Sequence, residues 1–163
     1  MIRYKWNKEF QKVFESNKID LDAEISFPIS LKKFLNKGIV MVDGCYYFKD
    51  FAGHYSEGEL FDRTGTECFN NHFHMENYCD IKESTEILRI GINFVKCLAY
   101  KLEFYSEPFC IILGYHNNSD FGIDINIRFH KIRKEETIYL EDIDTYTEEG
   151  IFLTFVNEKL LCK

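Results

Sequence analysis

The sequence predicts a single α+β domain over residues 1–163, in which an antiparallel β-sheet packs against a long α-helix, with additional short N-terminal helices and strands. Three observations predict this fold class. Residues 85–105 place apolar side chains at helical spacing, and residues 122–130 alternate apolar and polar side chains as strands do. The chain also contains 16 Phe and 10 Tyr against 9 Gly and 2 Pro, a balance that favours strands over long flexible loops.

The N-terminal part of the chain predicts two helices. Helical spacing of apolar residues predicts the first over residues 6–17, where the repeating side chains are Trp6, Phe10, Val13 and Phe14. Residues 19–30 follow as extended chain. Ser30 can then cap a second, short helix over residues 31–36, which Gly38 closes.

The next part predicts short strands and a loop. Residues 38–51 form a pair of strands that turn at Asp43-Gly44, a dipeptide typical of tight hairpins. Residues 53–67 have no clear period and predict a surface loop with a turn at Thr64-Gly65. Residues 68–78 predict a strand, because they alternate Phe69, Asn71, Phe73 and Met75 with Asn70, His72 and His74.

The second half has clearer signals. Ser84 precedes the long helix, and Gly91 inside it costs about 1 kcal/mol relative to Ala, which indicates close packing at that point. The elements expected after the helix are a buried strand at 109–116, a turn cluster at 117–122, the alternating strand, a short acidic turn or helix at 140–150 and a last strand at 151–158.

The negative charge is concentrated in one segment. The chain carries 27 Asp and Glu against 20 Lys and Arg, a net charge of −7. Residues 135–149 hold seven acids and no base, so the other acids balance the bases. Nucleic-acid binding needs a basic face, which this composition does not favour. The segment suits a basic partner, although a solvated acidic loop is the alternative interpretation.

Cysteine usage and the start of the chain suggest a compartment. Residues 1–14 are charged and amphipathic without the apolar core of a secretory signal, and no run approaches the ~18 apolar residues that span a membrane. No C-x-x-C pair occurs. We therefore expect free, mostly buried thiols in a reducing cytoplasm, at Cys45, Cys68, Cys79, Cys97, Cys110 and Cys162.

Histidines and cysteines provide the candidate chemistry. His72 and His74 share one face of the predicted strand and suit zinc, with Cys68 or Cys79 nearby. The simpler interpretation is a pair of histidines that hydrogen-bond their neighbours. A Cys–His nucleophile needs a thiol beside an imidazole, and no local pattern singles out such a pair.

Polar residues elsewhere suggest recognition rather than catalysis. The crowded acids at Glu141, Asp142 and Asp144 repel one another and suit an exposed patch better than an acid–base pair. No phosphate-binding loop or serine nucleophile motif occurs. Neighbours on a strand face lie about 6.6–7 Å apart, too far to form a catalytic cluster by themselves. We therefore interpret one such row as a wet recognition face, formed by Asp124, Asn126, Arg128 and His130.

Residues 67–156 resemble a group of small bacterial immunity proteins that are encoded beside contact-dependent growth inhibition toxins and related polymorphic toxins (CdiI-like). Three motifs carry this resemblance: N-H-x-H at residues 71–74, R-F-H-K-I-R at residues 128–133 and D-x-x-x-Y-x-E-E at residues 142–149. No catalytic signature accompanies the motifs. Residues 1–66 carry no part of the resemblance.

The resemblance implies a cytoplasmic protein without enzymatic activity, cofactor or metal, which binds the C-terminal domain of a CdiA-type toxin. Such toxins are often nucleases with a basic groove, so an acidic inhibitor suits them. We expect binding to occlude the active site or substrate groove, with no nucleic-acid or membrane partner. The expected contact residues are Glu135, Glu136, Tyr139, Glu141, Asp142, Asp144, Tyr146, Glu148 and Glu149, with a second patch at Glu57, Glu59 and Asp62.

Two alternatives belong to other classes. One is a small metal-dependent or Cys–His hydrolase that uses His72, His74 and a cysteine. The other is a structural or regulatory module of a phage or mobile element with an unknown protein partner. The sequence leaves the identity of the toxin, the affinity and the oligomeric state open.

Overall fold

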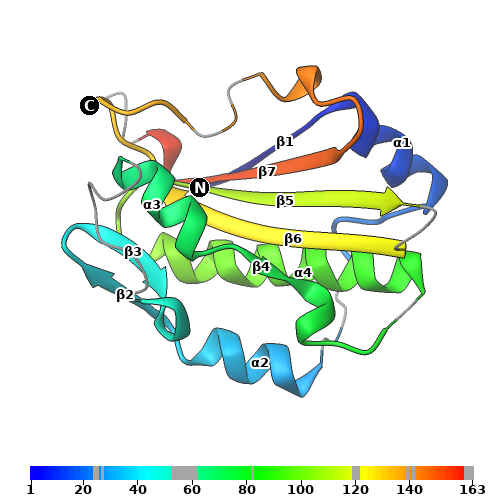
Figure 1. The fold of residues 1–163 in the computed structure, drawn as a ribbon, viewed down its shortest axis with the longest axis horizontal. Coiled ribbons are helices and arrows are strands. Elements are labelled where there is room, and N and C mark those ends of the chain that lie inside the picture. The colour runs from blue at the N-terminus through cyan, green and yellow to red at the C-terminus, as the bar shows by residue number, and fades with distance from the viewer. Residues whose placement is uncertain are drawn as a thin grey trace.

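The computed structural model describes residues 1–23, 26, 28–52, 62–81, 83–118, 122–138, 140 and 142–159. An antiparallel sheet with the strand order β1-β7-β5-β6-β4 forms its centre, and a separate hairpin pairs β2 with β3 (Figure 1). The strands are β1 (Ile2–Trp6), β2 (Ile39–Val42), β3 (Cys45–Phe48), β4 (Phe73–His74), β5 (Phe109–Asn118), β6 (Gly122–Lys131) and β7 (Gly150–Val156).

Four α-helices accompany the sheet in the described part of the chain: α1 (Lys8–Ser16), α2 (Ile29–Asn36), α3 (Arg63–Asn70) and α4 (Ser84–Glu103). Three short 3₁₀ turns join them, η1 (Lys49–Phe51), η2 (Met75–Asn77) and η3 (Ile143–Thr145). The prediction of an α+β fold with an antiparallel sheet is therefore confirmed. Within the described residues, no helix combines the length and the apolar character that a membrane crossing requires.

Helix α4 lies along one face of the sheet and forms the main core with β5, β6 and β7. Gly91 sits at the closest approach. A Cβ added there would lie 3.3 Å from both Ile125 Cγ2 and Leu113 Cδ1. The packing expected at this glycine is confirmed, because a larger side chain would push the helix away from the sheet.

The opposite face of the sheet is covered as well. Cys110, Ile112 and Leu153 point to this side and form a second apolar cluster. Residues that follow β6 complete it, with Ile132, Leu140 and Ile143 all buried. The stretch between β6 and β7 is therefore a cover for the sheet, even though η3 is its only regular element in the described residues.

The hairpin forms where the sequence predicts it. Asp43 and Gly44 have φ values of 51° and 80°, and positive φ at both central residues is what a two-residue hairpin turn requires. The prediction for the second helix, the long helix and the last three strands is also confirmed at the level of element type. The acidic stretch contains the short turn η3.

The first predicted helix begins too early. Trp6 belongs to β1, where it pairs with Phe152 of β7, and the helix begins at Lys8 after the cap Asn7. The Trp6 ring stacks on Phe14 with centroids 5.8 Å apart. This contact across the strand–helix junction explains why Trp6 fits the helical period without being helical.

The predictions for residues 62–78 are largely wrong, whereas residues 53–61 of the predicted loop lie outside the described part. Helix α3 occupies residues 63–70, and the carboxylate of its cap Asp62 accepts from Gly65 N at 2.7 Å. Only Phe73 and His74 form a strand. The buried side of α3 is largely polar, with Thr64, Thr66, Glu67 and Asn70 all buried, so apolar periodicity does not reveal the helix.

Candidate functional site

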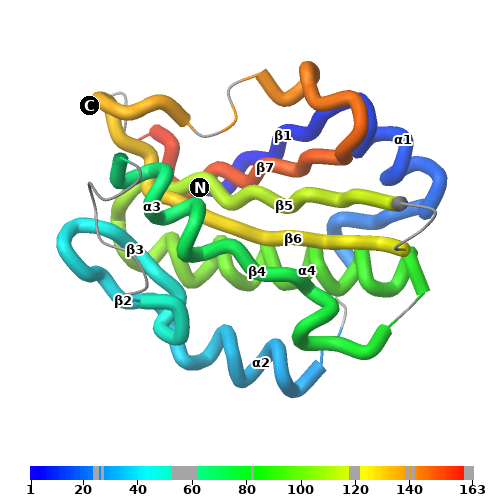
Figure 2. Tube along the Cα trace, viewed as in Figure 1, coloured from blue at the N-terminus to red at the C-terminus, as the bar shows by residue number. Residues whose placement is uncertain are grey.

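The acidic segment, residues 135–149, runs between β6 and β7 and passes the start of α1 (Figure 2). Four of its predicted contact acids are exposed: Glu135, Asp142, Asp144 and Glu148. Tyr146 leaves 41% of its surface exposed, which suits an aromatic contact. The other predicted contacts Tyr139, Glu141, Glu57 and Glu59 lie outside the described residues.

A single buried side chain holds this segment in place. Asn7 Nδ2 donates to three main-chain oxygens, those of Ile143 at 3.3 Å, Tyr146 at 3.0 Å and Glu149 at 2.8 Å. Its Oδ1 accepts from the amides of Phe10 and Ile151, both at 2.9 Å. Asn7 therefore caps α1 and fixes the acidic segment at the same time. The sequence signal was available, since an Asn directly before a helical period is a typical N-cap.

Two contact acids predicted from the sequence have structural partners instead of a free carboxylate. Asp62 caps α3, as described above. Glu136 Oε2 accepts from Thr64 N at 2.8 Å and lies 3.7 Å from Arg133 Nη1. Burial raises the pKa of Glu136, but the Thr64 hydrogen bonds and Arg133 outweigh it and lower the pKa below its usual range. Glu136, which is half-buried, is therefore less available to a partner than the exposed acids. Asp62 remains exposed while it caps α3, and Asp144 of the acidic segment likewise accepts from Lys8 N at 3.2 Å.

Glu149 connects the acidic segment to the polar row of β6. A Cβ added at Gly114 would lie 2.2 Å from Glu149 Oε1, so the glycine makes room for this carboxylate. The same oxygen lies 3.4 Å from Asn126 Nδ2. The predicted contact residue Glu149 and the row of Asn126 thus meet on the sheet face that α4 leaves open.

The polar row of β6 is only partly exposed to solvent. Asn126 is 7% exposed and His130 is fully buried, so the prediction of a wet face is wrong for these two residues. The reason is that α3 packs against β6 and the acidic segment covers the neighbouring strands. Asp124 and Arg128 remain half-buried and contact the histidines of the β4 region.

The two histidines lie together, but they have different partners. Their ring centroids are 4.7 Å apart. Arg128 Nη2 donates to His72 Nε2 at 3.1 Å, so this nitrogen is an acceptor and His72 is neutral. Burial, with Arg128 and His74 beside it, lowers the pKa of His72 to about 4. His74 Nδ1 instead lies 2.7 Å from Asp124 Oδ1.

The cysteines do not join this group. The described cysteines are free thiols, as predicted. Cys68 and Cys79, the suggested partners of the histidines, are buried, and Cys79 Sγ donates to Met75 O at 3.2 Å. Burial raises the pKa of both thiols. A protonated thiol is neither a good nucleophile nor a metal ligand.

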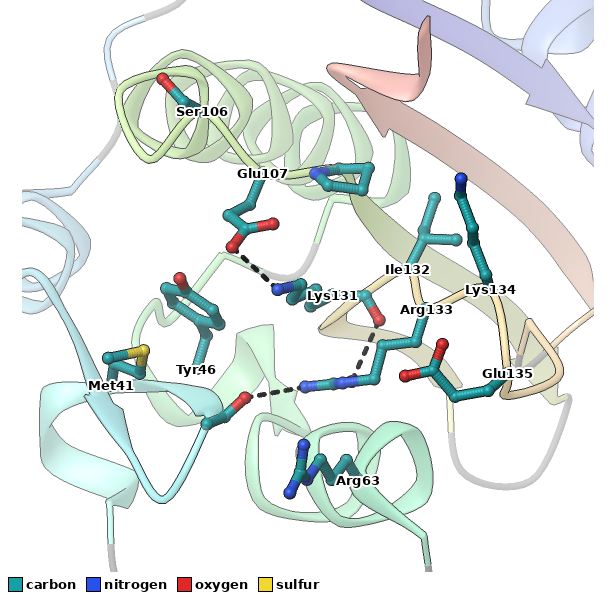
Figure 3. A pocket seen from close by; sticks show the side chains of 12 residues that line it. Met41, Tyr46, Arg63, Ser106, Glu107, Lys131, Ile132, Arg133, Lys134 and Glu135 are labelled. Carbon is teal, nitrogen blue, oxygen red and sulfur yellow. Dashed lines mark hydrogen bonds and ion pairs between the residues drawn. The ribbon is translucent and has the colours of Figure 1, made fainter. Parts of the chain in front are cut away.

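A cavity of about 450 Å³ lies between the β2–β3 hairpin, the end of α4 and the end of β6 (Figure 3). Two of the basic residues that line it, Lys131 and Arg133, come from the R-F-H-K-I-R motif and are paired within the fold. Lys131 Nζ lies 2.8 Å from Glu107 Oε1, and Arg133 Nη2 donates to Gly44 O at 3.0 Å. Two further basic residues line the cavity from outside the motif, Arg63 and Lys134.

Behind this cavity lies a buried ion pair that sequence reasoning missed. Both oxygens of Glu67, which is 0% exposed, accept from Arg133, at 2.8 and 2.9 Å. They also accept from the amides of Tyr46 and Lys131, both at 2.7 Å. Four donors on one carboxylate tie α3 to the hairpin and to the end of β6. No local signal marks a Glu in an unpatterned stretch, because its partners are distant in the sequence.

Comparison with known proteins identifies a family but names no activity. The family model of the uncharacterized protein PM0498 family matches residues 5–159. A relative from Pasteurella multocida (strain Pm70), "Uncharacterized protein PM0498", is 28% identical over 154 residues, which cover 88% of this chain and 91% of the relative. No solved structure matches the chain. The chain belongs to the uncharacterized protein PM0498 family.

Proposed function

We propose that this protein is an immunity protein, a cytoplasmic inhibitor that binds a toxin domain with a basic surface and covers its active site or substrate groove. One observation carries the proposal. Residues 143–149 of the acidic segment, which include the exposed acids Asp144 and Glu148, are held by the three carbonyl contacts of Asn7 and by the buried Ile143. A loop that served only for solubility would not need such an anchor.

Preorganisation is what makes the acidic segment suitable for binding. Exposed acids attract a basic partner over a distance and speed its association. Residues 143–149, which Asn7 already holds in place, lose little conformational entropy when the partner arrives. Tyr146, exposed within the segment, adds an aromatic side chain of the kind that contributes strongly at interfaces.

The hydrolase alternative receives less support from the geometry. His72 Nε2 is occupied by Arg128, and burial raises the pKa of the thiols that lie closest in sequence. A Cys–His mechanism needs a thiolate beside a free imidazole nitrogen. Turnover of ester or phosphodiester substrates that is lost in His72→Ala would restore this alternative.

The decisive experiment is co-expression. The C-terminal ~150–250 residues (one to two domains) of the protein encoded immediately upstream are expressed alone and together with this chain. We expect the fragment to stop growth alone, and the two proteins to co-purify one to one when growth is restored. A harmless fragment, or restored growth without a complex, would overturn the proposal.

The contact surface is tested with matched variants. In the test variant Lys replaces four exposed acids of the segment, Glu135, Asp142, Asp144 and Glu148. In the control variant Lys replaces four exposed acids elsewhere, Glu15, Asp22, Asp80 and Glu86, so the net charge is the same. Protection and affinity should be lost in the test variant and kept in the control. Equal effects in both would assign binding to net charge rather than to this surface.

A further inference from the structure

A second feature lies at the other end of the polar row, where β4 meets η2. Within the described residues, the side chains of His74, Glu76 and Asp124 bring their ligand atoms within 4.8 Å of one another. His74 ends the short strand β4, Glu76 lies in η2 directly after it, and Asp124 comes from β6. The pairing of His74 with Asn126 fixes the relation of the two strands.

The Nδ1 nitrogen of His74 can donate a hydrogen bond to only one of the two carboxylates beside it. His74 Nδ1 lies 2.7 Å from Asp124 Oδ1 and 3.7 Å from Glu76 Oε1. The nitrogen carries at most one proton, which the nearer carboxylate of Asp124 accepts. The carboxylate of Glu76 therefore lies near the same nitrogen without a hydrogen bond to it. A divalent cation between the three side chains would bind the nitrogen and both carboxylates at once.

We propose that His74, Glu76 and Asp124 form a divalent-cation site that takes Zn²⁺. One imidazole nitrogen and two carboxylate oxygens suit Zn²⁺ better than Mg²⁺ or Ca²⁺, which prefer oxygen ligands alone. Tetrahedral zinc with ligands at about 2.1 Å places them about 3.4 Å apart. His74 Nδ1 lies 2.7 Å from Asp124 Oδ1 and 3.7 Å from Glu76 Oε1, so small rotations of the two partly exposed acidic side chains would bring the ligand atoms to this spacing.

The ligand set differs from the one that the sequence suggested. His72 is not part of it, because its Nε2 accepts from Arg128, and the cysteines nearby are buried away from it. The fourth position of the ion faces outward, since the side chains of His74 and Asp124 are each 37% exposed and that of Glu76 is 52% exposed. Three protein ligands with an open position leave room for water or for a donor group of a partner.

Binding would also join two parts of the sheet. Strand β4 has only two residues, so its attachment to β6 rests on few main-chain contacts. An ion shared by the β4–η2 corner and Asp124 adds a link between them. Because the ion binds only the folded arrangement, Zn²⁺ raises the stability of the protein as its concentration rises. This site does not depend on the proposed immunity function.

The test is a titration of the purified, fully reduced chain with Zn²⁺ by calorimetry, beside thermal unfolding with and without the ion. We expect one Zn²⁺ per chain and a higher Tm. His74→Ala and Asp124→Asn should weaken binding by about tenfold or more and remove the Tm shift. His72→Ala and His116→Ala are the matched controls and should keep the affinity within about twofold. Glu76→Gln, at the most exposed ligand, removes one charge without disturbing packing and should give an intermediate loss.

Cobalt provides a readout of ligand type. A Co²⁺ adduct should show ligand-field bands without the near-ultraviolet band of a thiolate ligand, because no cysteine takes part. Absence of binding to the wild-type chain would overturn the site. Unchanged affinity in His74→Ala, or a thiolate band, would overturn it too, by assigning the ion to other surface groups or to cysteines.

Discussion

Asn7 Nδ2 lies 2.8 Å from the carbonyl oxygen of Glu149, although 142 positions separate the two residues in the chain. This contact joins the first helix to the segment that carries most of the protein's excess negative charge. It makes the arrangement of exposed acids a property of the folded core rather than of a loose loop.

Replacement of Asn7 should therefore affect stability and partner binding together. Asn7→Ala removes the α1 cap and leaves buried carbonyl groups without a donor, so we expect a loss of about 2–4 kcal/mol in the free energy of unfolding. Urea denaturation measures it. Asn7→Asp keeps the cap oxygen but places its second carboxylate oxygen against the three carbonyl oxygens, which repel it. At neutral pH it should therefore be no more stable than Asn7→Ala, and both variants should loosen the acidic segment, which faster amide exchange at residues 143–149 would report.

The Glu67–Arg133 pair should be one of the most sensitive points of the fold. Glu67→Ala removes the buried carboxylate that pairs with Arg133 and leaves two main-chain amides without their acceptor, and we expect it to cost about 3–5 kcal/mol. Glu135→Ala is the control, since this exposed acid should change stability by about 0.5 kcal/mol or less. Similar denaturation midpoints for both variants would contradict the role assigned to Glu67.

Acid should destabilise the protein through His130. Burial, with Arg133 nearby, lowers the pKa of His130 to about 4, although its Nδ1 donates to Lys131 O at 3.0 Å. The unfolded chain therefore binds a proton that the folded chain excludes, and the stabilisation present above about pH 6.5 is lost as the pH falls toward 4, by up to ~1.4 kcal/mol per pH unit for one histidine. Stability measured from pH 7 to pH 4.5 tests this.

The variant His130→Leu isolates that contribution. It should take up about one proton fewer on unfolding at pH 5 than the wild-type chain. His72, whose pKa is also lowered to about 4, continues to contribute in the variant. An unchanged pH dependence in His130→Leu would mean that His130 is not the buried neutral group described here.

Association with a basic partner should depend on salt. If the exposed acids steer the encounter, raising the ionic strength from ~0.05 M to ~0.5 M should slow association by about tenfold or more and change dissociation much less. Stopped-flow kinetics separates the two rates. The charge-reversed segment variant should show a flat salt dependence, whereas the control variant with the other four acids reversed should keep a falling one.

The sequence predicts those elements whose signals are local. Asp43-Gly44 marks its hairpin through the positive φ values it tolerates, and the apolar stripe of α4 extends over most of its length. Helix α3 is missed because it buries polar side chains, among them Thr66 and Glu67. Strand β1 is missed, and its last residue Trp6 is assigned to the helix because it contacts Phe14 across the junction and fits the helical period.

The candidate site also has features that the sequence shows locally and features that it does not. The acidic segment is found directly, because counting the charged residues is enough to locate it. Asn7 shows in the sequence only as a helix cap, because its contacts with the acidic segment join residues far apart in the chain. The role of Glu67 is not visible at all, since its partner Arg133 is also distant in the chain. The metal ligands illustrate this well. The sequence singles out His74 because His72 lies two positions before it. Asp124 lies beside His74 only because β4 pairs with β6, which the sequence does not show.

The pairing of β1 with β7 has a consequence for synthesis of the protein. Ile2 lies opposite Val156, so β1 finds its partner only after β7 has been synthesised. Contacts this distant in sequence form late and slow the folding of a sheet. During synthesis the main-chain groups of β1 therefore stay unpaired while the rest of the sheet is being made, which leaves them open to pairing with another chain.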